Sequence, residues 1–151
     1  MINDTNIRFA QPEDLPKVIV LCELHAEFER TSYDQTDKLQ KLQTALFGRQ
    51  PKLYCLVLEV NHEVVGYATY MNQFSTWDSD FYVYLDCLYI EKAHRGSGFG
   101  KMLMLKIKEE ATASGIKEIQ WQTPDFNHTA IEFYKKLGGL SKSKERFFWA
   151  L

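Results

Sequence analysis

The stretch Tyr84-Leu-Asp-Cys-Leu-Tyr-Ile-Glu-Lys-Ala-His-Arg-Gly-Ser-Gly-Phe-Gly100 decides the fold of this chain. Residues 81–90 are rich in aromatic and aliphatic side chains and predict a strand. His94–Gly100 is a glycine-rich turn, and apolar residues then recur at four-residue spacing up to Ala111, which predicts a helix ended by Gly115. Such a strand, turn and helix start can bind phosphate, because glycines admit the anion and the first-turn N–H groups attract it.

The residues of this turn also allow other interpretations to be compared with phosphate binding. Three glycines also fit a tight strand-to-helix turn that binds no ligand. A nucleotide P-loop is disfavoured because no Gly-Lys-Ser/Thr closes the turn, and a dinucleotide site because no GxGxxG opens an early βαβ unit. Arg95 and Lys101 would add positive charge beside a bound phosphate.

The rest of the chain continues the mixture of helix and strand. Three-and-four spacing predicts helices over Leu15–Phe28 and Thr36–Phe47, and another that Asn127 caps and Gly138 ends. Further strands are predicted at Ile7–Phe9, Leu53–Leu58, Val64–Tyr70, Ile116–Gln122 and Arg146–Leu151. With no linker or repeat, this order predicts one α/β domain over residues 1–151, its mixed sheet covered by helices on both faces.

The charge balance argues against a nucleic-acid partner. Lys and Arg number 18 and Asp and Glu 20, a formal net charge of −2, whereas domains that follow phosphate backbones carry a strong basic excess. Acids outnumber bases up to Asp37, and bases outnumber acids beyond it. We therefore expect no nucleic-acid partner, and an acidic N-terminal part suited to a cationic ligand.

Cysteine use and hydropathy indicate the compartment. The cysteines number 3, without CxxC pairing or zinc spacing, so neither a disulfide scaffold nor a metal site is predicted. Met1–Phe9 is too polar for a secretory leader, and no apolar run reaches the length of a membrane span. We expect a soluble, cytoplasmic protein with no membrane partner.

Two separated motifs resemble those of the GNAT superfamily of N-acetyltransferases. Arg95-x-x-Gly98-x-Gly100 after a long strand resembles the acetyl-CoA loop, and Asn127-x-x-Ala130-x-x-Phe133-Tyr134-Lys-Lys-Leu-Gly138 resembles the last catalytic helix. The resemblance implies a mainly antiparallel central sheet. Features similar to the diamine and polyamine acetyltransferase branch are Phe47-Gly48, Pro51 with Cys55-Leu56-Val57, Trp77 and Tyr84-Leu85-Asp86.

The resemblance implies acetyl-CoA as co-substrate and a homodimer. The strand end at Leu88, Tyr89 and Ile90 would hold the pantetheine arm. The turn would hold the pyrophosphate through Arg95, Gly96, Ser97, Gly98, Phe99, Gly100 and Lys101. Asn127 would contact the coenzyme near the thioester, and Tyr134 would lie beside the sulfur.

Asp86 is the candidate for the group that accepts the proton of the amine. An alkyl ammonium has a pKa of about 10.4, and only the neutral amine attacks a thioester. Strand alternation predicts Tyr84, Asp86, Leu88 and Ile90 on one face and Leu85, Cys87 and Tyr89 on the other. A carboxylate within an apolar strand also fits a structural ion pair, and a water relay would extend its reach, because the resembling branch usually has Glu here.

Tyr134 is the candidate acid that protonates the departing thiolate. Without the resemblance, it would be interpreted as a core aromatic with a solvated hydroxyl. Cys87 beside Asp86 would permit an acetyl-cysteine intermediate. We reject that role because alternation places the thiol on the opposite face and free cysteines are mostly buried.

Acidic and aromatic residues near the first helix and around Trp77 are the candidates for acceptor binding. They are Glu27, Glu29, Tyr33, Trp77, Asp78 and Asp80, together with Asp86. Collectively they favour a cationic acceptor, with aromatic faces for cation–π contact. His25, His62, His94 and His128 have no metal spacing and are interpreted as surface or loop residues.

The leading hypothesis is direct acetyl transfer from acetyl-CoA to a small cationic amine, diamine-like or polyamine-like, in a ternary complex. One alternative is an aminoglycoside, peptide or amino-acid acceptor on the same scaffold. Another is a non-catalytic acyl-CoA-binding sensor, which the presence of both Asp86 and Tyr134 disfavours. A protein-interaction module is the remaining alternative.

Overall fold

One five-stranded sheet organises the chain in the computed structural model, which describes residues 4–151. Met1 to Asn3, where the predicted domain begins, lie outside the described residues. The strands lie in the order β1 (Thr5–Phe9), β2 (Tyr54–Val60), β3 (Glu63–Ser75), β4 (Asp80–Ile90) and β5 (Ile119–Trp121). The first four pair antiparallel and β5 pairs parallel to β4, which confirms the predicted mixed, mainly antiparallel sheet.

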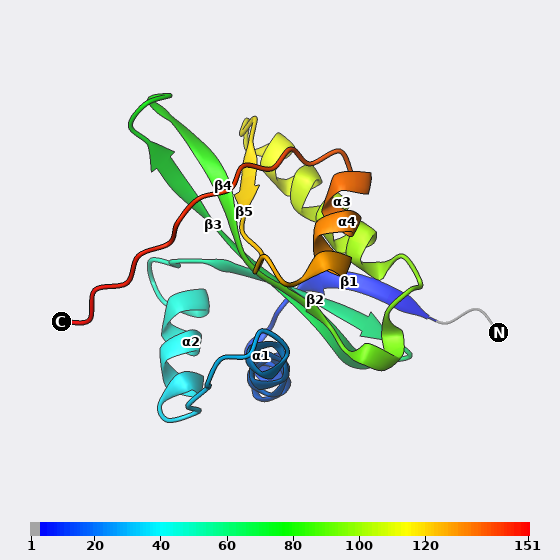
Figure 1. Cartoon of the computed structure of the whole chain (residues 1–151). Coiled ribbons are helices and arrows are strands. Elements are labelled where there is room, and N and C mark those ends of the chain that lie inside the picture. Colours follow the sequence, from blue (N-terminus) through cyan, green and yellow to red (C-terminus); the bar gives the residue numbers. More distant parts are fainter. Residues whose placement is uncertain (1–3) are drawn as a thin grey trace.

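Helices cover both faces of this sheet (Figure 1). α1 (Leu15–Phe28) and α2 (Lys38–Phe47) lie on one face, and α3 (Phe99–Ala113) and α4 (His128–Lys136) on the other. Short 3-10 turns, η1 (Pro12–Asp14) and η2 (Lys92–His94), precede α1 and α3. None of the helices in this described part of the chain is long and apolar enough to cross a bilayer.

Each face buries its own apolar cluster. Under α3, residues such as Leu58, Leu103 and Ile107 are fully buried. Under α1, Leu21 and Tyr67 are buried in a second cluster. The hydrophobic effect acts on both faces, so the sheet is a rigid central layer from which site residues project on either side.

Arg8 fixes the start of α1 against the sheet. Its guanidinium donates to Asp14 at 2.7 and 3.0 Å and to Glu59 at 2.7 Å, so β1, η1 and β2 are tied together. These bonds to Arg8 lower the pKa of the Asp14 carboxyl, although partial burial opposes the effect. The direction in which α1 crosses the sheet is thereby set at its first turn.

A β-bulge at Asp86 changes the face assignment of β4. Thr69 pairs with Cys87 and Tyr70 with Leu85, so Asp86 is the extra residue between two paired positions. Leu85 therefore packs in the α3-side cluster, whereas Cys87 packs against the α1-side cluster. The predicted strict alternation along β4 is wrong, because it places Leu85 and Cys87 on the same face.

The predicted final strand, Arg146–Leu151, is also wrong for the single chain. Residues 140–151, here called the extended segment, form neither helix nor strand and run away from the sheet (Figure 1). Phe147 and Trp149 are 90% and 91% exposed. Apolar side chains on a strand are stabilised only where another strand pairs with it and a layer covers it, and neither is present here.

Candidate active site

The glycine turn opens onto the N-terminus of α3. Gly96 and Gly98 have φ of 82° and 83°, a left-handed conformation that strains other residues. Gly98 caps α3, and its carbonyl accepts from Met102 N–H at 3.1 Å. The N–H groups of a first helical turn have no intrahelical partner, so those of Phe99, Gly100 and Lys101 are available to an anion.

Gly100 brings α4 close to this turn. A Cβ added at Gly100 would lie 3.1 Å from Phe133 Cζ, so the glycine permits the close approach of α3 and α4. Phe133 in turn packs against Tyr134, whose ring also contacts Trp121 of β5 at a centroid distance of 5.2 Å. The phenol of Tyr134 is therefore held between the turn and the end of the sheet.

Burial determines the protonation of Tyr134. It raises the pKa of this phenol to about 12, and the negative charge of Glu29 acts in the same direction. At neutral pH the hydroxyl therefore keeps its proton, as a hydrogen donor or general acid requires.

Two other predicted coenzyme residues have structural partners. Arg95 donates through Nε to the carbonyl of Ile90 at 2.8 Å, and its guanidinium lies 4.8 Å from the Phe28 ring centroid and 5.2 Å from that of Tyr89. Asn127 Oδ1 accepts from Ala130 N–H at 3.2 Å, which confirms the predicted cap of α4. Their coenzyme contacts stay predictions, as do those of Leu88, Ser97 and Lys101.

The C-terminal end of α1 meets the loop before α4. The Arg30 guanidinium lies 4.0 Å from the centroid of the Phe126 ring. This contact brings the neighbouring Glu29 close enough to Tyr134 to act on its pKa. Glu29 is half-buried, whereas Glu27 is exposed to solvent. Of the two predicted acceptor acids at the end of α1, Glu29 is therefore the one that faces the site.

His25 lies at the centre of a polar network that the sequence interpretation missed. Its Nδ1 lies 3.0 Å from the Tyr67 hydroxyl and its Nε2 3.2 Å from Glu29 Oε1. The ring stacks on Tyr89 with centroids 5.3 Å apart. The interpretation of His25 as a surface residue is wrong, because its side chain is only 13% exposed.

The spacing of α1 contained the signal for this placement. His25 follows Val18 and Leu21 on the same helical stripe, and these two residues are buried. A histidine on a buried stripe needs hydrogen-bond partners, because an unpaired buried polar group is costly. Those partners come from β3 and from the next turn of the helix, and the β3 partner could not be inferred from spacing.

Asp86 and Cys87 lie together on the α1 side of β4. Cys87 Sγ donates to Asp86 Oδ2 at 3.8 Å, so the two side chains do not point to opposite faces. The face argument against an acetyl-cysteine is therefore wrong. A different observation replaces it: burial, reinforced by Asp86, raises the pKa of Cys87 to about 12, which disfavours the nucleophilic thiolate.

Tyr33 joins the same side of the site. It follows α1, and its hydroxyl lies near the Cys22 thiol. Burial raises the pKa of Tyr33 to about 12, so it stays neutral. The Lys38 ammonium lies 5.2 Å from the Tyr33 ring centroid, which shows that this aromatic face accepts a cation.

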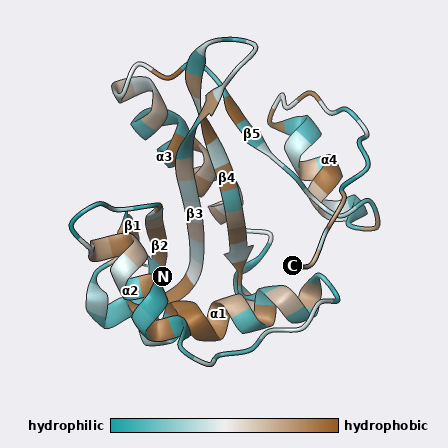
Figure 2. Cartoon of the chain, turned by 90° about the vertical axis from the view of Figure 1, so that its left-hand side faces the viewer, coloured by the Kyte–Doolittle hydropathy of each residue, from teal (hydrophilic) through white to brown (hydrophobic). Residues whose placement is uncertain are grey.

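The remaining predicted acceptor residues lie elsewhere in the single chain. Trp77, Asp78 and Asp80 are at the tip of the β3–β4 hairpin, which points away from α1 along the strands (Figure 2). Trp77 is 98% exposed. Asp78 accepts from Ser75 Oγ at 2.9 Å, and Asp80 Oδ1 from Phe81 N–H at 2.8 Å. Within one chain these residues do not meet Glu29.

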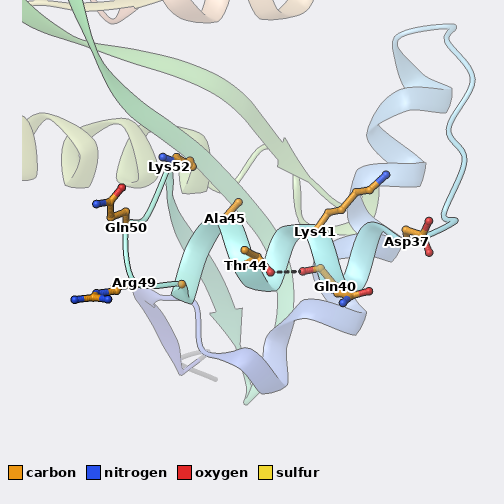
Figure 3. A pocket seen from close by; sticks show the side chains of 9 residues that line it. Asp37, Gln40, Lys41, Thr44, Ala45, Arg49, Gln50 and Lys52 are labelled. Atoms are coloured by element: carbon orange, nitrogen blue, oxygen red, sulfur yellow. Dashed lines mark hydrogen bonds between the residues drawn. The ribbon is translucent and has the colours of Figure 1, made fainter.

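A hollow of about 600 Å³ lies on the outer side of α2 (Figure 3). Its lining includes Lys41, Thr44 and Arg49, and Thr44 Oγ1 donates to the Gln40 carbonyl at 3.1 Å. None of the predicted site residues lines it.

Within residues 4–151, no group of three or more His, Cys, Asp or Glu could hold a metal ion.

Comparisons with known proteins agree with this architecture. Residues 19–139 match the Acetyltransferase (GNAT) family. Thialysine N-epsilon-acetyltransferase of Mus musculus is 32% identical over 142 residues, covering 89% of this chain and 83% of that protein. Spermidine/spermine N(1)-acetyltransferase-like protein 1 of Homo sapiens is 26% identical, covering 92% of this chain and 21% of that protein. The solved structure of a possible acetyltransferase from Clostridium difficile 630 superposes with a TM-score of 0.80 at 23% identity, covering 97% of both chains.

Proposed function

Because the chain belongs to the acetyltransferase (GNAT) family, we propose that it acetylates the primary amine of a small cationic acceptor. It is an acetyl-CoA-dependent acetyltransferase, and we propose that residues 1–151 act as one domain. The acceptor class is a diamine, a polyamine or a lysine-like amine such as thialysine. The observation that carries this choice is the half-buried Glu29 carboxylate at the end of α1, whose negative charge acts on the pKa of the Tyr134 hydroxyl.

Coenzyme binding is assigned to the turn and to the end of β4. The open N–H groups at the start of α3 suit a pyrophosphate, and Arg95 and Lys101, close to them in sequence, would add positive charge. Leu88, Tyr89 and Ile90 precede that turn and would pair with the amide groups of pantetheine. Asn127 at the cap of α4 would contact the same arm from the opposite helix.

The reaction needs one proton acceptor and one proton donor. Asp86, directly or through a water, takes a proton from the bound ammonium. The neutral amine nitrogen then attacks the thioester carbonyl carbon, the C–N bond forms and the C–S bond breaks. The departing thiolate takes the proton of Tyr134, and the Tyr134 phenolate regains a proton from the acetylated nitrogen, which must lose its second proton to become the amide. Asp86 passes its proton to solvent, and acetylated amine and CoA leave. Transfer is direct, because the raised pKa of Cys87 disfavours an acetyl-cysteine.

The acceptor site gathers around the end of α1. A carboxylate beside the reacting amine favours cations through Coulomb attraction, and Glu29 is placed for this role with Glu27 further out. Tyr33 would supply an aromatic face to the aliphatic cation. Electrostatic preference of this kind weakens with added salt, because counterions screen the carboxylates. The exposed Glu27 is screened more than the half-buried Glu29.

A CoA-release assay tests the proposal. Acetyl-CoA is offered with putrescine, spermidine, thialysine or an aminoglycoside in separate reactions. We expect turnover with at least one of the small aliphatic amines and a much lower kcat/KM for the aminoglycoside. Measurable acetyl-CoA binding without turnover on any amine would instead identify a non-catalytic acyl-CoA sensor.

We also propose that two chains form a homodimer by exchange of the extended segment. This segment presents Phe147, Phe148 and Trp149 to solvent. Among the described strands β5 pairs only with β4, which leaves an open strand edge. A strand from a second copy would cover both features at once. Trp77, Asp78 and Asp80 would then join an acceptor site only from that second subunit.

Removal of residues 140–151 is expected to convert the dimer to a monomer, because the segment supplies the exchanged apolar side chains. Light scattering coupled to size exclusion measures the mass directly. Phe148→Asp with Trp149→Asp is the full-length counterpart, and Lys142→Ala is the matched control within the same segment. A full chain that is monomeric at all concentrations, or a truncated chain that stays dimeric, contradicts the exchange.

The cysteines support a cytoplasmic location, which we also propose. Cys22, Cys55 and Cys87 are all free thiols. Cys55 and Cys87 have pKa values raised to about 12 by burial, which makes them poor partners for thiol exchange. A protein whose thiols are free and protected suits a reducing compartment.

A further inference from the structure

His25 is a largely buried titratable group that the proposed reaction does not use. The Glu29 carboxylate can only accept, so the 3.2 Å contact assigns the proton to Nε2 of His25. Nδ1 then accepts from the Tyr67 hydroxyl at 3.0 Å. Tyr67 lies on the central strand β3 and is only 1% exposed, so this bond anchors the imidazole to the buried centre of the sheet.

We propose that His25 is a positioning residue for the cationic acceptor, holding the Glu29 carboxylate at the place where the ammonium binds. The inference rests on the proposed function and deepens it. α1 ends at Phe28, so Glu29 lies beyond the last helical residue. Without a donor, a carboxylate there would turn toward bulk water, away from Tyr134.

The hydrogen bonds are selective for imidazole at this position. The neighbours of His25 on its stripe are aliphatic, and a leucine would satisfy the packing alone. A leucine could form neither hydrogen bond, whereas one ring nitrogen of His25 accepts from Tyr67 of β3 and the other donates to Glu29. Stacking on Tyr89 fixes the ring plane, so the N–H direction is set as well.

The charge state of His25 supports a cation site. Facing it are Glu29 just after its own helix, Tyr67 from β3, Tyr89 and Asp86 from β4, and Arg95 after η2. Burial lowers the pKa of His25 despite the nearby Glu29. A neutral imidazole leaves the full negative charge of Glu29 to the acceptor, whereas an imidazolium would neutralise it.

Two amide substitutions separate positioning from packing. The side-chain nitrogen of Gln occupies the place of histidine Nε2, whereas that of Asn occupies the place of Nδ1. His25→Gln therefore keeps a donor for Glu29, and we expect its amine KM within about threefold of the wild type. His25→Asn loses that donor, and loss of one charge-assisted bond is expected to raise the amine KM about tenfold. The acetyl-CoA KM should change in neither variant.

Coupling to Glu29 completes the test. In a Glu29→Gln background, His25→Asn should produce no further rise in amine KM, because the carboxylate that it orients is gone. The ¹⁵N shifts of the wild-type imidazole should show the proton on Nε2.

An unchanged amine KM in His25→Asn, or equal rises in amine KM in the Asn and Gln variants, would overturn the inference. Absence of wild-type turnover on every amine would instead contradict the proposed function, while proton placement on Nδ1 would contradict this inference alone.

Discussion

Tyr134→Phe is expected to lower kcat by at least about a hundredfold while leaving acetyl-CoA affinity nearly unchanged. Removal of a general acid typically costs that much, because the thiolate must then leave without its proton. The ring itself stays, and with it the contacts to Trp121 and Phe133. The loss is therefore confined to the hydroxyl, whose pKa of about 12 keeps it protonated at working pH.

Steady-state CoA release gives kcat for this variant, and calorimetric titration gives the acetyl-CoA Kd. Tyr54→Phe is the matched control, because Tyr54 stacks on Tyr70 outside the site and also loses only a hydroxyl. Its kcat should equal that of the wild type. A Tyr134→Phe enzyme with wild-type kcat removes the acid role, and a parallel loss of coenzyme affinity would assign Tyr134 to binding.

Asp86→Asn is expected to lower kcat/KM for the amine by about a hundredfold, the usual size of a general-base contribution. The amide is nearly isosteric but cannot take a proton from an ammonium. Since Asp86 is the extra residue of a bulge and is exposed, the substitution disturbs no ladder partner. We expect the melting temperature of the variant to stay close to that of the wild type.

The measurement is kcat/KM for the best amine at several pH values across the stable range. Cys87→Ala is the matched control on the next residue, because its thiol contacts Asp86 without a proposed role in the chemistry. Activity in Cys87→Ala should persist, which also tests direct transfer against an acetyl-cysteine. Full activity of Asp86→Asn at every pH would remove its assignment as the base.

Local patterns were sufficient to predict most of the fold. The strand–turn–helix around Gly96 and Gly98 is present, and the positive φ of both glycines explains why the pattern identifies the turn. α1 spans Leu15–Phe28, the same bounds that apolar spacing predicts. These features depend on neighbouring residues, so a single sequence contains the information for them.

Features that depend on distant partners could not be predicted in this way. The bulge at Asp86 arises from pairing with β3, and no local rule counts the extra residue. Arg146–Leu151 has a strand pattern but no partner strand among residues 4–151. His25 needed the position of Tyr67, 42 residues away in sequence, before its role was visible.

The bulge on β4 also makes this strand tolerant of a shorter length at one position. Before Asp86 the odd-numbered residues of β4 face the α3-side cluster, and after it the even-numbered residues do. A substitution at this position changes one side chain. Deletion of Asp86 would close the bulge, because Leu85 and Cys87 already pair with the consecutive residues Tyr70 and Thr69 of β3. The side chains from Cys87 to Ile90 would keep their faces, the coenzyme turn would stay in its layer, and only the carboxylate would be lost.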